Sequence, residues 1–261
     1  MVKAIHPTAI VDPRAMIDGD VEIGEYVVIG PGVVVGSGSV IGPFTRIEGP
    51  TTIGERNHFT SHCSIGTPPQ DFKFRGEHTE LVIGNDNMFR ELVTINRGTP
   101  GGGAITRIGS NNFIMISSHI AHDCRVGSNV IFANGATLAG HVEVGDHATI
   151  GAFSAIHQFC RVGDHAFVGG YTVATQDALP YVKTVGSRPA KTYGVNTIGL
   201  QRKGFPKETI EALQRAYRVL RRSHLRLEEA LMRIESELGL VAEARYFVEF
   251  IRGASMRGFV H

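Results

Sequence analysis

The sequence predicts a mainly β protein: a parallel β-helix built from six-residue repeats, followed by a C-terminal α-helical domain. Two observations support this prediction. An aliphatic or aromatic residue recurs every six positions, 25 times between Ile5 and Val168. After Phe205 the spacing of apolar residues changes to three and four, the period of an α-helix. Neither a helix nor an alternating strand repeats strictly at six, so the first part of the chain turns a corner in every repeat.

The six-residue repeat fits one short strand plus a corner. Three such sides, or three repeats, make one coil, and successive coils stack at the ~4.8 Å spacing of paired strands. The repeat residue should point into the resulting prism. Glycine often follows the repeat residue, and we expect it where the corner needs unusual backbone angles. Cys63, Cys124 and Cys160 all occupy the position four after a repeat residue, which predicts buried core residues without a redox role.

Two loops interrupt the repeat. Between Ile65 and Ile83 the sequence is polar and contains proline and glycine, which predicts an excursion near residues 67–81. Since the step from Ile65 to Ile83 equals three repeats, or one coil, we expect the loop to replace sides of a coil. The step from Ile95 to Ile108 exceeds two repeats by one position, which predicts a loop near residues 99–106 that inserts one or seven residues. Loops on a rigid scaffold often carry functional residues.

The chain beyond the repeats is expected to be helical. Pro206 suits the first turn of a helix, and apolar residues then recur at helical spacing. Two further helices are indicated around Leu227 and Tyr246. We therefore place the β-helix in residues 1–190 and the helical domain in residues 191–261.

Charge and composition exclude several classes of function. The net charge is +1, so neither nucleic acid nor a membrane surface is indicated as a partner. Residues 202–261 hold 12 Lys and Arg against 8 Asp and Glu, so the helical end is mildly basic. No apolar run approaches ~20 residues, and the start lacks the apolar core of a signal peptide. We expect a cytoplasmic protein without integral membrane association, and three cysteines without a CxxC pair fit a reducing compartment.

One stretch keeps the six-residue repeat but fills its variable positions with reactive side chains: His119-Ile120-Ala121-His122-Asp123-Cys124. Because three repeats make one coil, His141 lies one coil above His122, and His157 lies a further coil up near the same edge. If the second loop inserts seven residues, Asn96 falls just below. These positions predict a polar groove along one edge of the prism over about four coils.

Not every histidine belongs to this groove. His147 and His165 also occur at corners, which polar residues usually fill, and we expect both to be exposed to solvent. One histidine at a corner is better explained as a surface residue. Three on one edge, beside an aspartate, are better explained as a functional site.

Three kinds of chemistry could use such a groove. Nucleophilic catalysis by Cys124 is disfavoured, because its position in the repeat buries the thiol. Metal binding is the second kind, since some trimeric β-helices bind zinc between subunits; the ligands would come from His119, His122, His141 and His157. General base catalysis is the third. A neutral histidine can remove a proton from a hydroxyl near neutral pH, and an adjacent carboxylate such as Asp123 can orient its ring.

Several stretches together resemble the UDP-N-acetylglucosamine O-acyltransferases, the family that begins lipid A biosynthesis in Gram-negative bacteria. The stretches that carry the resemblance are Gln70-Asp71-Phe72-Lys73, Thr94-Ile95-Asn96-Arg97-Gly98-Thr99, His119 to Cys124, Leu138-Ala139-Gly140-His141-Val142, His157-Gln158-Phe159-Cys160, Gly194-Val195-Asn196 and Gly204-Phe205. They span nearly the whole chain, whereas six-residue repeats alone would indicate only a superfamily. The resemblance implies a left-handed coil, although parallel crossovers generally favour the right hand.

The resemblance also implies a reaction. The 3-hydroxyl of UDP-N-acetylglucosamine would attack the thioester of a (3R)-3-hydroxyacyl chain on acyl carrier protein. His122 matches the family's general base, Asp123 its partner, and the N–H of Gly140 the donor to the thioester oxyanion. The residues that match the lining of the nucleotide-sugar and acyl groove are Asp71, Lys73, Asn96, His119, His141, His157, Gln158, Asn196 and Arg202. The family works as a homotrimer with grooves between neighbouring prisms, and needs no metal or other cofactor.

The chain departs from the family pattern at three positions. Asn96 stands in place of a histidine near the reacting sugar, Ile198 in place of a glutamate and Lys203 in place of an arginine. These changes leave open whether the acceptor carries a 3-hydroxyl or a 3-amino group. Three competing functions also stay open: the N-acyltransferase of the same pathway, a zinc-dependent β-helix hydratase, and a non-catalytic β-helix scaffold.

Two further expectations concern the acyl donor. Gly170 matches the position that measures acyl length in the family, and it should lie two to three coils above His122. Four arginines crowd the first long helix, and we expect them to help dock acidic acyl carrier protein. They are Arg215, Arg218, Arg221 and Arg222.

Overall fold

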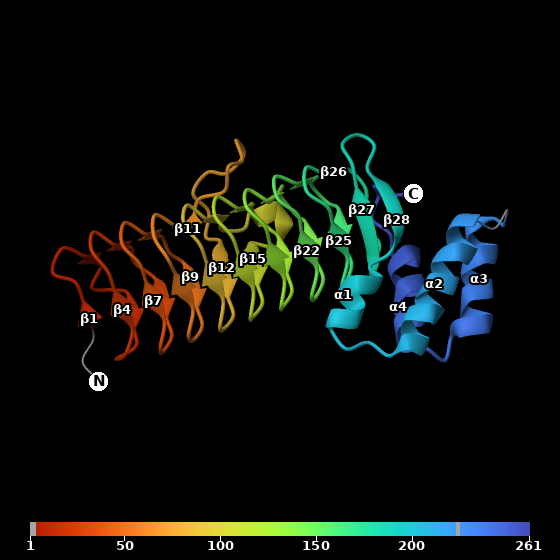
Figure 1. Cartoon of the computed structure of the whole chain (residues 1–261). Helices are drawn as coiled ribbons and strands as arrows, with labels where there is room; N and C mark the ends of the chain where they lie inside the picture. The colour runs from red at the N-terminus through yellow and green to blue at the C-terminus, as the bar shows by residue number, and fades with distance from the viewer. Residues whose placement is uncertain (1–3, 223–224) are drawn as a thin grey trace.

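The computed structural model describes residues 4–222 and 225–261. Within these ranges the chain forms a long prism of stacked coils with a group of helices at its C-terminal end (Figure 1). Three sheets, here called A, B and C, run along the prism, and each full coil contributes one strand to each of them in that order. The predicted fold class, a mainly β parallel β-helix followed by helices, is confirmed.

The strands are short, because each spans only one side of the prism. Sheet A contains β1 (Ala4–Ile5), β4 (Glu22–Ile23), β7 (Val40–Ile41), β10 (His58–Phe59), β13 (Met88–Phe89), β16 (Phe113–Ile114), β19 (Ile131–Phe132), β22 (Thr149–Ile150), β25 (Phe167–Val168), β27 (Val182–Val185) and β28 (Lys191–Val195). Sheet B contains β2 (Ile10–Val11), β5 (Val28–Ile29), β8 (Arg46–Ile47), β11 (Ser64–Thr67), β14 (Thr94–Asn96), β17 (His119–Ile120), β20 (Thr137–Leu138), β23 (Ala155–Ile156) and β26 (Val173–Ala174). Sheet C contains β3 (Met16–Ile17), β6 (Val33–Val35), β9 (Thr51–Ile53), β12 (Glu80–Ile83), β15 (Ile105–Ile108), β18 (Arg125–Val126), β21 (Glu143–Val144) and β24 (Arg161–Val162).

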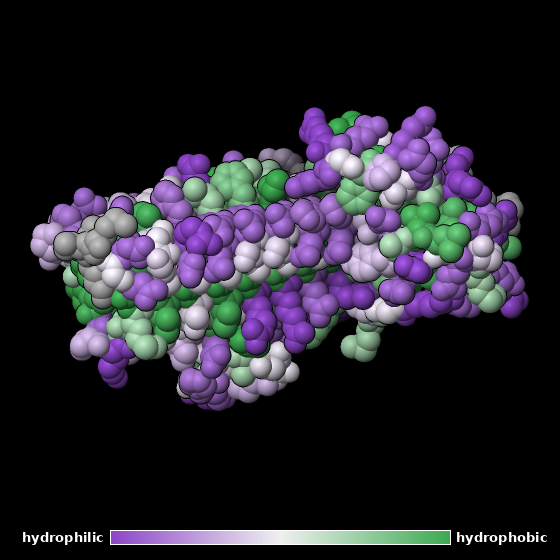
Figure 2. Space-filling view, turned by 90° about the horizontal axis from the view of Figure 1, so that it is seen from below, coloured by the Kyte–Doolittle hydropathy of each residue, from purple (hydrophilic) through white to green (hydrophobic). Residues whose placement is uncertain are grey.

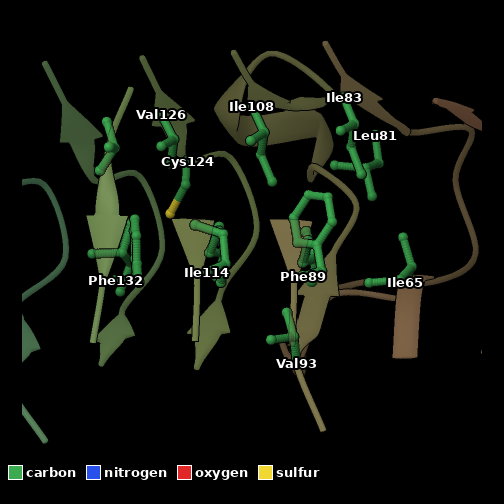
Figure 3. Close-up of a cluster of buried hydrophobic side chains, with 14 of the residues drawn as sticks. Ile65, Leu81, Ile83, Phe89, Val93, Ile108, Ile114, Cys124, Val126 and Phe132 are labelled. Atoms are coloured by element: carbon green, nitrogen blue, oxygen red, sulfur yellow. The ribbon is translucent and has the colours of Figure 1, made fainter. Parts of the chain in front are cut away.

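Repeat residues fill the interior of the prism. Ile114, Phe132 and Ile150 follow one another up sheet A and are fully buried. Figure 3 shows side chains from facing walls, Phe89 and Cys124 among them, pointing into the shared interior. All three cysteines are buried and free, which confirms their prediction as core residues.

The first loop is an insertion and does not replace sides of a coil, so that expectation was wrong. Ile83 pairs with Ile53 in sheet C, whereas replacement of two sides would have set it against Ile65 in sheet B. The coil therefore keeps all three sides and carries extra residues between β11 and β12. A gap of three repeats keeps the pattern in frame either way, so spacing alone could not distinguish the two. The second loop inserts seven residues, one of the two predicted lengths, because Thr94 pairs with His119.

At most positions the glycine after a repeat residue permits close stacking and does not supply the left-handed corner we expected; Gly66, with φ 70°, is the exception. An added Cβ on Gly42 would overlap the carbonyl oxygen of Thr60 in the next coil, and one on Gly36 would lie 2.8 Å from the carbonyl carbon of Gly54. The left-handed backbone lies two residues further on, for example at Phe44 with φ 59°. At Gly36 and Gly42 the stacked coils leave no room for a side chain.

Four α-helices cap the prism within the described residues: α1 (Thr197–Arg202), α2 (Lys207–Arg222), α3 (Leu227–Leu238) and α4 (Ala242–Arg252). The three longer helices confirm the predicted ones, and they share a second apolar core with the last strands. β28 pairs antiparallel with β27, so β structure extends to Val195, past the predicted boundary at residue 190. The two-domain division itself stays a prediction. No helix in the described part of the chain has the length and apolarity needed to cross a membrane.

His147 and His165 are not solvated corner residues, so that expectation was wrong. Their rings stack at 4.5 Å, and Phe205 packs edge-on against His165 at 4.8 Å. Burial, with the nearby charges of His147 and Lys203, lowers the pKa of His165 to about 4. The segment before α2 folds back over this corner, which six-residue spacing could not reveal.

Candidate active site

The edge between sheets B and C gathers most of the predicted site residues. The chain crosses this edge after β11, β14, β17, β20 and β23, so both loops and three histidine-bearing turns lie on it. The N–H of His141 donates to the carbonyl oxygen of His122 at 3.0 Å, and the N–H of Phe159 donates to the carbonyl oxygen of Gly140 at 3.3 Å. The turns therefore stack one above another, as the length of the coil predicted.

His122 and Asp123 form a hydrogen-bonded pair at the centre of this edge. Nδ1 of His122 lies 2.8 Å from Oδ2 of Asp123. An ionised carboxylate only accepts hydrogen bonds, so the proton of the neutral imidazole lies on Nδ1. The other ring nitrogen, Nε2, has no partner among the residues that the structure describes, and the side chain is 16% exposed. Nε2 is therefore free to take a proton from a bound molecule.

Asp123 is buried, yet it is held in its ionised form. The N–H of Thr99 donates to Oδ1 at 2.8 Å, and the Thr99 hydroxyl donates to Oδ2 at 2.6 Å. Burial alone would raise the pKa of this carboxyl, but the hydrogen bonds from His122 and Thr99 outweigh it, so the pKa of Asp123 lies below its usual value. A fixed negative charge beside Nδ1 stabilises the imidazolium that forms when Nε2 takes a proton.

Gly140 lies directly against the His122 ring. A Cβ added to Gly140 would lie 2.5 Å from Cε1 and 2.8 Å from Nε2 of His122. The residue is buried, and its N–H has no hydrogen-bond partner within the described ranges. A buried N–H without a partner is rare in folded proteins. Its position beside Nε2 suits a donor to an oxyanion that forms there.

Two further histidines flank the pair. Nδ1 of His119 lies 2.7 Å from the hydroxyl of Thr94, and burial, followed by the nearby His122, lowers the pKa of His119. His141 places Nε2 at 3.6 Å from Oδ2 of Asp123. Burial also lowers the pKa of His141, although the charge of Asp123 opposes this shift. Both imidazoles are therefore predominantly neutral near pH 7 and can act as hydrogen-bonding groups.

A cavity of about 410 Å³ lies between the two loops and the histidine edge. It brings Asp71 and Lys73 of the first loop together with His141, although these residues are far apart in the sequence. Its lining also includes Phe74, Glu77, Thr99, Pro100, Gly101 and Phe159. His157 and Gln158 form the turn above, where Nδ1 of His157 lies 3.1 Å from the Gln158 carbonyl oxygen. A polar ligand placed here would reach both loops and His141.

Asn96 is on this edge but does not face the cavity. It is 2% exposed, and its amide nitrogen donates to the hydroxyl of Thr67 at 2.9 Å and to the carbonyl oxygen of Pro68 at 3.0 Å. These bonds anchor the first loop where it leaves β11. Its Oδ1 is buried and has no partner in the described structure. We therefore place Asn96 in the support of the loop, while its predicted contact with substrate stays a prediction.

Three predicted residues lie elsewhere on the prism. Asn196 and Arg202 line a cavity of about 570 Å³ over sheet A, beside Ile131 and Phe167. Gly170 lies between β25 and β26, at the edge between sheets A and B. Within one chain the structure does not bring these residues to His122.

Two alternative chemistries can be judged from the same geometry. Burial raises the pKa of the Cys124 thiol to about 12, so this cysteine has almost no thiolate near neutral pH. His122, Asp123 and His141 place one potential ligand atom each within 4.8 Å of one another. Three such ligands could in principle hold zinc. The predicted absence of a metal therefore has to be tested directly.

Comparisons with known proteins show the family. A family model described as bacterial transferase hexapeptide (six repeats) matches residues 4–37 and 105–140, and one described as UDP N-acetylglucosamine O-acyltransferase, domain 2, matches residues 177–260. The chain is 50% identical over 256 residues to the acyl-[acyl-carrier-protein]–UDP-N-acetylglucosamine O-acyltransferase of Syntrophobacter fumaroxidans, covering 98% of this chain and 99% of that protein. The chain belongs to the UDP-N-acetylglucosamine O-acyltransferase family.

Solved structures of this family have the same fold. The UDP-N-acetylglucosamine O-acyltransferase from Moraxella catarrhalis superposes with a TM-score of 0.96 at 42% identity, over 99% of this chain and all of that one. The enzyme from Francisella novicida superposes with a TM-score of 0.93 at 35% identity, over 98% and 93%. Family membership confirms the resemblance inferred from the sequence.

The role of Thr99 was missed in the sequence. Thr99 was part of one stretch that resembles the O-acyltransferase family, but it precedes Pro100 at the start of the short 3₁₀ helix η1 (Pro100–Gly102), where threonine usually acts as a cap. Its side chain makes no cap bond and turns to Asp123 instead. Only the tertiary structure shows that the Thr99 hydroxyl binds Asp123 and does not cap the helix.

Proposed function

We propose that this protein transfers a (3R)-3-hydroxyacyl chain from acyl carrier protein to the 3-hydroxyl of UDP-N-acetylglucosamine, the first step of lipid A biosynthesis. The observation that carries the proposal is the free Nε2 of His122, which is backed by Asp123 and lies against Gly140, whose N–H is unpaired in the described structure. The O-acyltransferase names of relatives at 46–50% identity favour an O-ester product over an amide. We keep the prediction that the reaction takes place in the cytoplasm.

The reaction follows from the two groups that meet at Gly140. Nε2 of His122 takes the proton of the sugar 3-hydroxyl while that oxygen attacks the thioester carbonyl carbon. The N–H of Gly140 donates to the oxyanion that develops on the carbonyl oxygen. When the carbon–sulfur bond breaks, the thiolate of the carrier takes the proton from the imidazolium. His122 returns to its neutral form, and the ester remains on the sugar.

A trimer would complete the site. His122 lies on the B–C edge, whereas Asn196 and Arg202 lie over sheet A, so one chain cannot enclose a substrate with both sets. The outward positions of sheet A include Phe113, Ile131 and Phe167, while those of β18, β21 and β24 in sheet C are the charged Arg125, Glu143 and Arg161. In Figure 2, hydrophobic patches lie on either side of a hydrophilic band that runs along the prism. We propose that sheet A of one copy packs on sheet B of the next, bringing the nucleotide-binding residues to His122 of its neighbour.

An activity panel tests the proposed function. Purified protein is assayed with UDP-N-acetylglucosamine or its 3-amino analogue and with carrier protein loaded with hydroxyacyl chains of several lengths. We expect an ester with the first acceptor, and undiminished activity after exhaustive chelation with no zinc in elemental analysis. Preference for the 3-amino sugar would support the alternative acceptor. A requirement for metal would point to zinc chemistry at His122, Asp123 and His141. If neither UDP-sugar binds, the protein would instead be a non-catalytic β-helix scaffold.

Docking of the carrier is expected to depend on salt. Arg218 and Arg221 are exposed on α2, and Arg215 is exposed although it pairs with Glu237 at 3.3 Å. Attraction between exposed charges is screened as ionic strength rises. We therefore expect KM for acyl carrier protein to rise with salt, and to rise about tenfold at low salt in an Arg218→Glu/Arg221→Glu variant. A KM that is flat with salt and unchanged in the variant would exclude this docking surface; KM for the UDP-sugar is the internal control.

Gly170 is expected to measure the acyl chain. It lies three coils above His122, about 14 Å at ~4.8 Å per coil, which an extended acyl chain can span. It faces the site only from a neighbouring copy, so this prediction depends on the trimer. A Cβ on Gly170 would lie 3.3 Å from the carbonyl oxygen of Ala152, a slightly tight contact, and its φ is not left-handed, so a side chain there requires only a small shift of the neighbouring backbone. Gly170→Met should shift preference to shorter chains by about tenfold in relative kcat/KM. Equal losses on short and long donors would exclude the role.

A further inference from the structure

We infer that Thr99 is a positioning residue for the catalytic base, and that the second loop acts as a rigid clamp on Asp123. The inference rests on the proposed role of His122 as the base. It adds a residue whose side chain hydrogen-bonds to Asp123, the partner of the base. Thr99 acts through the carboxylate that orients the imidazole.

The hydrogen bonds around Asp123 carry the inference. Thr99 supplies two donors, its N–H to Oδ1 at 2.8 Å and its hydroxyl to Oδ2 at 2.6 Å. Oδ2 also accepts the Nδ1–H of His122 at 2.8 Å. The Asp123 side chain is completely buried, so solvent cannot replace a lost donor. Thr99 therefore fixes the plane of the carboxylate, and through Oδ2 the orientation of the His122 ring.

The loop is built to hold Thr99 in place. The N–H groups of Gly102 and Ala104 both donate to the Thr99 carbonyl oxygen, at 3.0 and 2.8 Å, and close a tight turn. An added Cβ on Gly102 would overlap the Asp123 carboxyl group, so the turn approaches Asp123 as closely as glycine permits. At the start of the loop, Nη1 of Arg97 donates to the carbonyl oxygens of Gly49 and Gly66 at 3.0 and 2.8 Å. The seven inserted residues thus form an anchored turn against the catalytic pair.

A Thr99→Val variant tests the hydroxyl, because valine has the same shape but no donor. Loss of one charge-assisted hydrogen bond should lower kcat by about 10- to 100-fold. The acid limb of the pH–rate profile should move to higher pH, since a carboxylate with one donor fewer holds the imidazolium more tightly. Thr99→Ser keeps the donor and should remain within about threefold of wild type, with an unshifted acid limb.

A second measurement does not depend on activity. The Nδ1–H proton of His122, hydrogen-bonded to a carboxylate, is expected as a downfield resonance in spectra of ¹⁵N-histidine-labelled protein. It should shift or disappear in Thr99→Val and persist in Thr99→Ser. If wild type shows this resonance but no acyl transfer, the proposed function fails while the clamp stands. If serine behaves like valine in kinetics and spectra, the hydroxyl is not the positioning group.

Thr184→Val is the matched control. Thr184 is fully buried in β27, and its hydroxyl has no partner in the described structure. The same substitution there should leave kcat, the acid limb and the downfield resonance unchanged. A Thr99→Val enzyme that is kinetically within twofold of wild type, with the same pH profile and resonance, would overturn the inference.

Discussion

Replacing His122 by alanine is expected to lower kcat by about 10²- to 10⁴-fold, the usual contribution of a general base. Nε2 of His122 lies beside Gly140 and is free to accept a proton, and the buried charge of Asp123 is oriented toward that ring. Initial rates with saturating UDP-N-acetylglucosamine and acyl carrier protein measure the effect. Calorimetric binding of the UDP-sugar should be much less affected than turnover.

The His122→Ala experiment needs a control in which an imidazole is removed from a position outside the proposed site. His6 lies in the first coil of the prism, five coils below His122, and is not part of the B–C edge site. His6→Ala should retain wild-type turnover. A His122→Ala enzyme that keeps more than about a tenth of wild-type activity, while remaining folded, would remove histidine from the base role.

Replacing Gly140 by alanine is expected to lower kcat by about 100-fold, although the change adds only one methyl group. The new Cβ would lie 2.5 Å from Cε1 of His122, closer than real Cβ contacts, so the ring has to move. Movement of the ring disturbs its 2.8 Å hydrogen bond to Asp123 and shifts Nε2 away from the acceptor hydroxyl. Displacement of a catalytic group by about 1 Å can cost roughly 10²-fold in rate.

Gly19→Ala provides the matched control, because a Cβ on Gly19 meets nothing within 4 Å and the backbone there is not left-handed. It should leave both activity and thermal stability unchanged. Gly140→Ala should retain its melting temperature to within a few degrees if the ring simply turns aside. Turnover within threefold of wild type would show that His122 does not need the position it has against Gly140.

Much of the site could be predicted because the coil converts sequence spacing into position. Because three repeats make one coil, the spacing of His122, His141 and His157 predicts that they lie on one edge of the prism. The structure places them there. The buried cysteines and the three longer helices were predictable for the same reason, since each depends on a local period.

The sequence by itself determined the repeat, the edge that carries the proposed catalytic pair, and the family. The tertiary structure decided what a strict period cannot encode. The step from Ile65 to Ile83 fits an insertion and a replaced coil equally well, so only strand pairing located the first loop. The hydroxyl of Thr99 could cap a turn or bind a carboxylate, and only the folded loop shows that it binds Asp123. Asn196, Arg202 and Gly170 lie on other faces of the prism, because a residue's face depends on the sheet it follows and on how the last strands and helices pack.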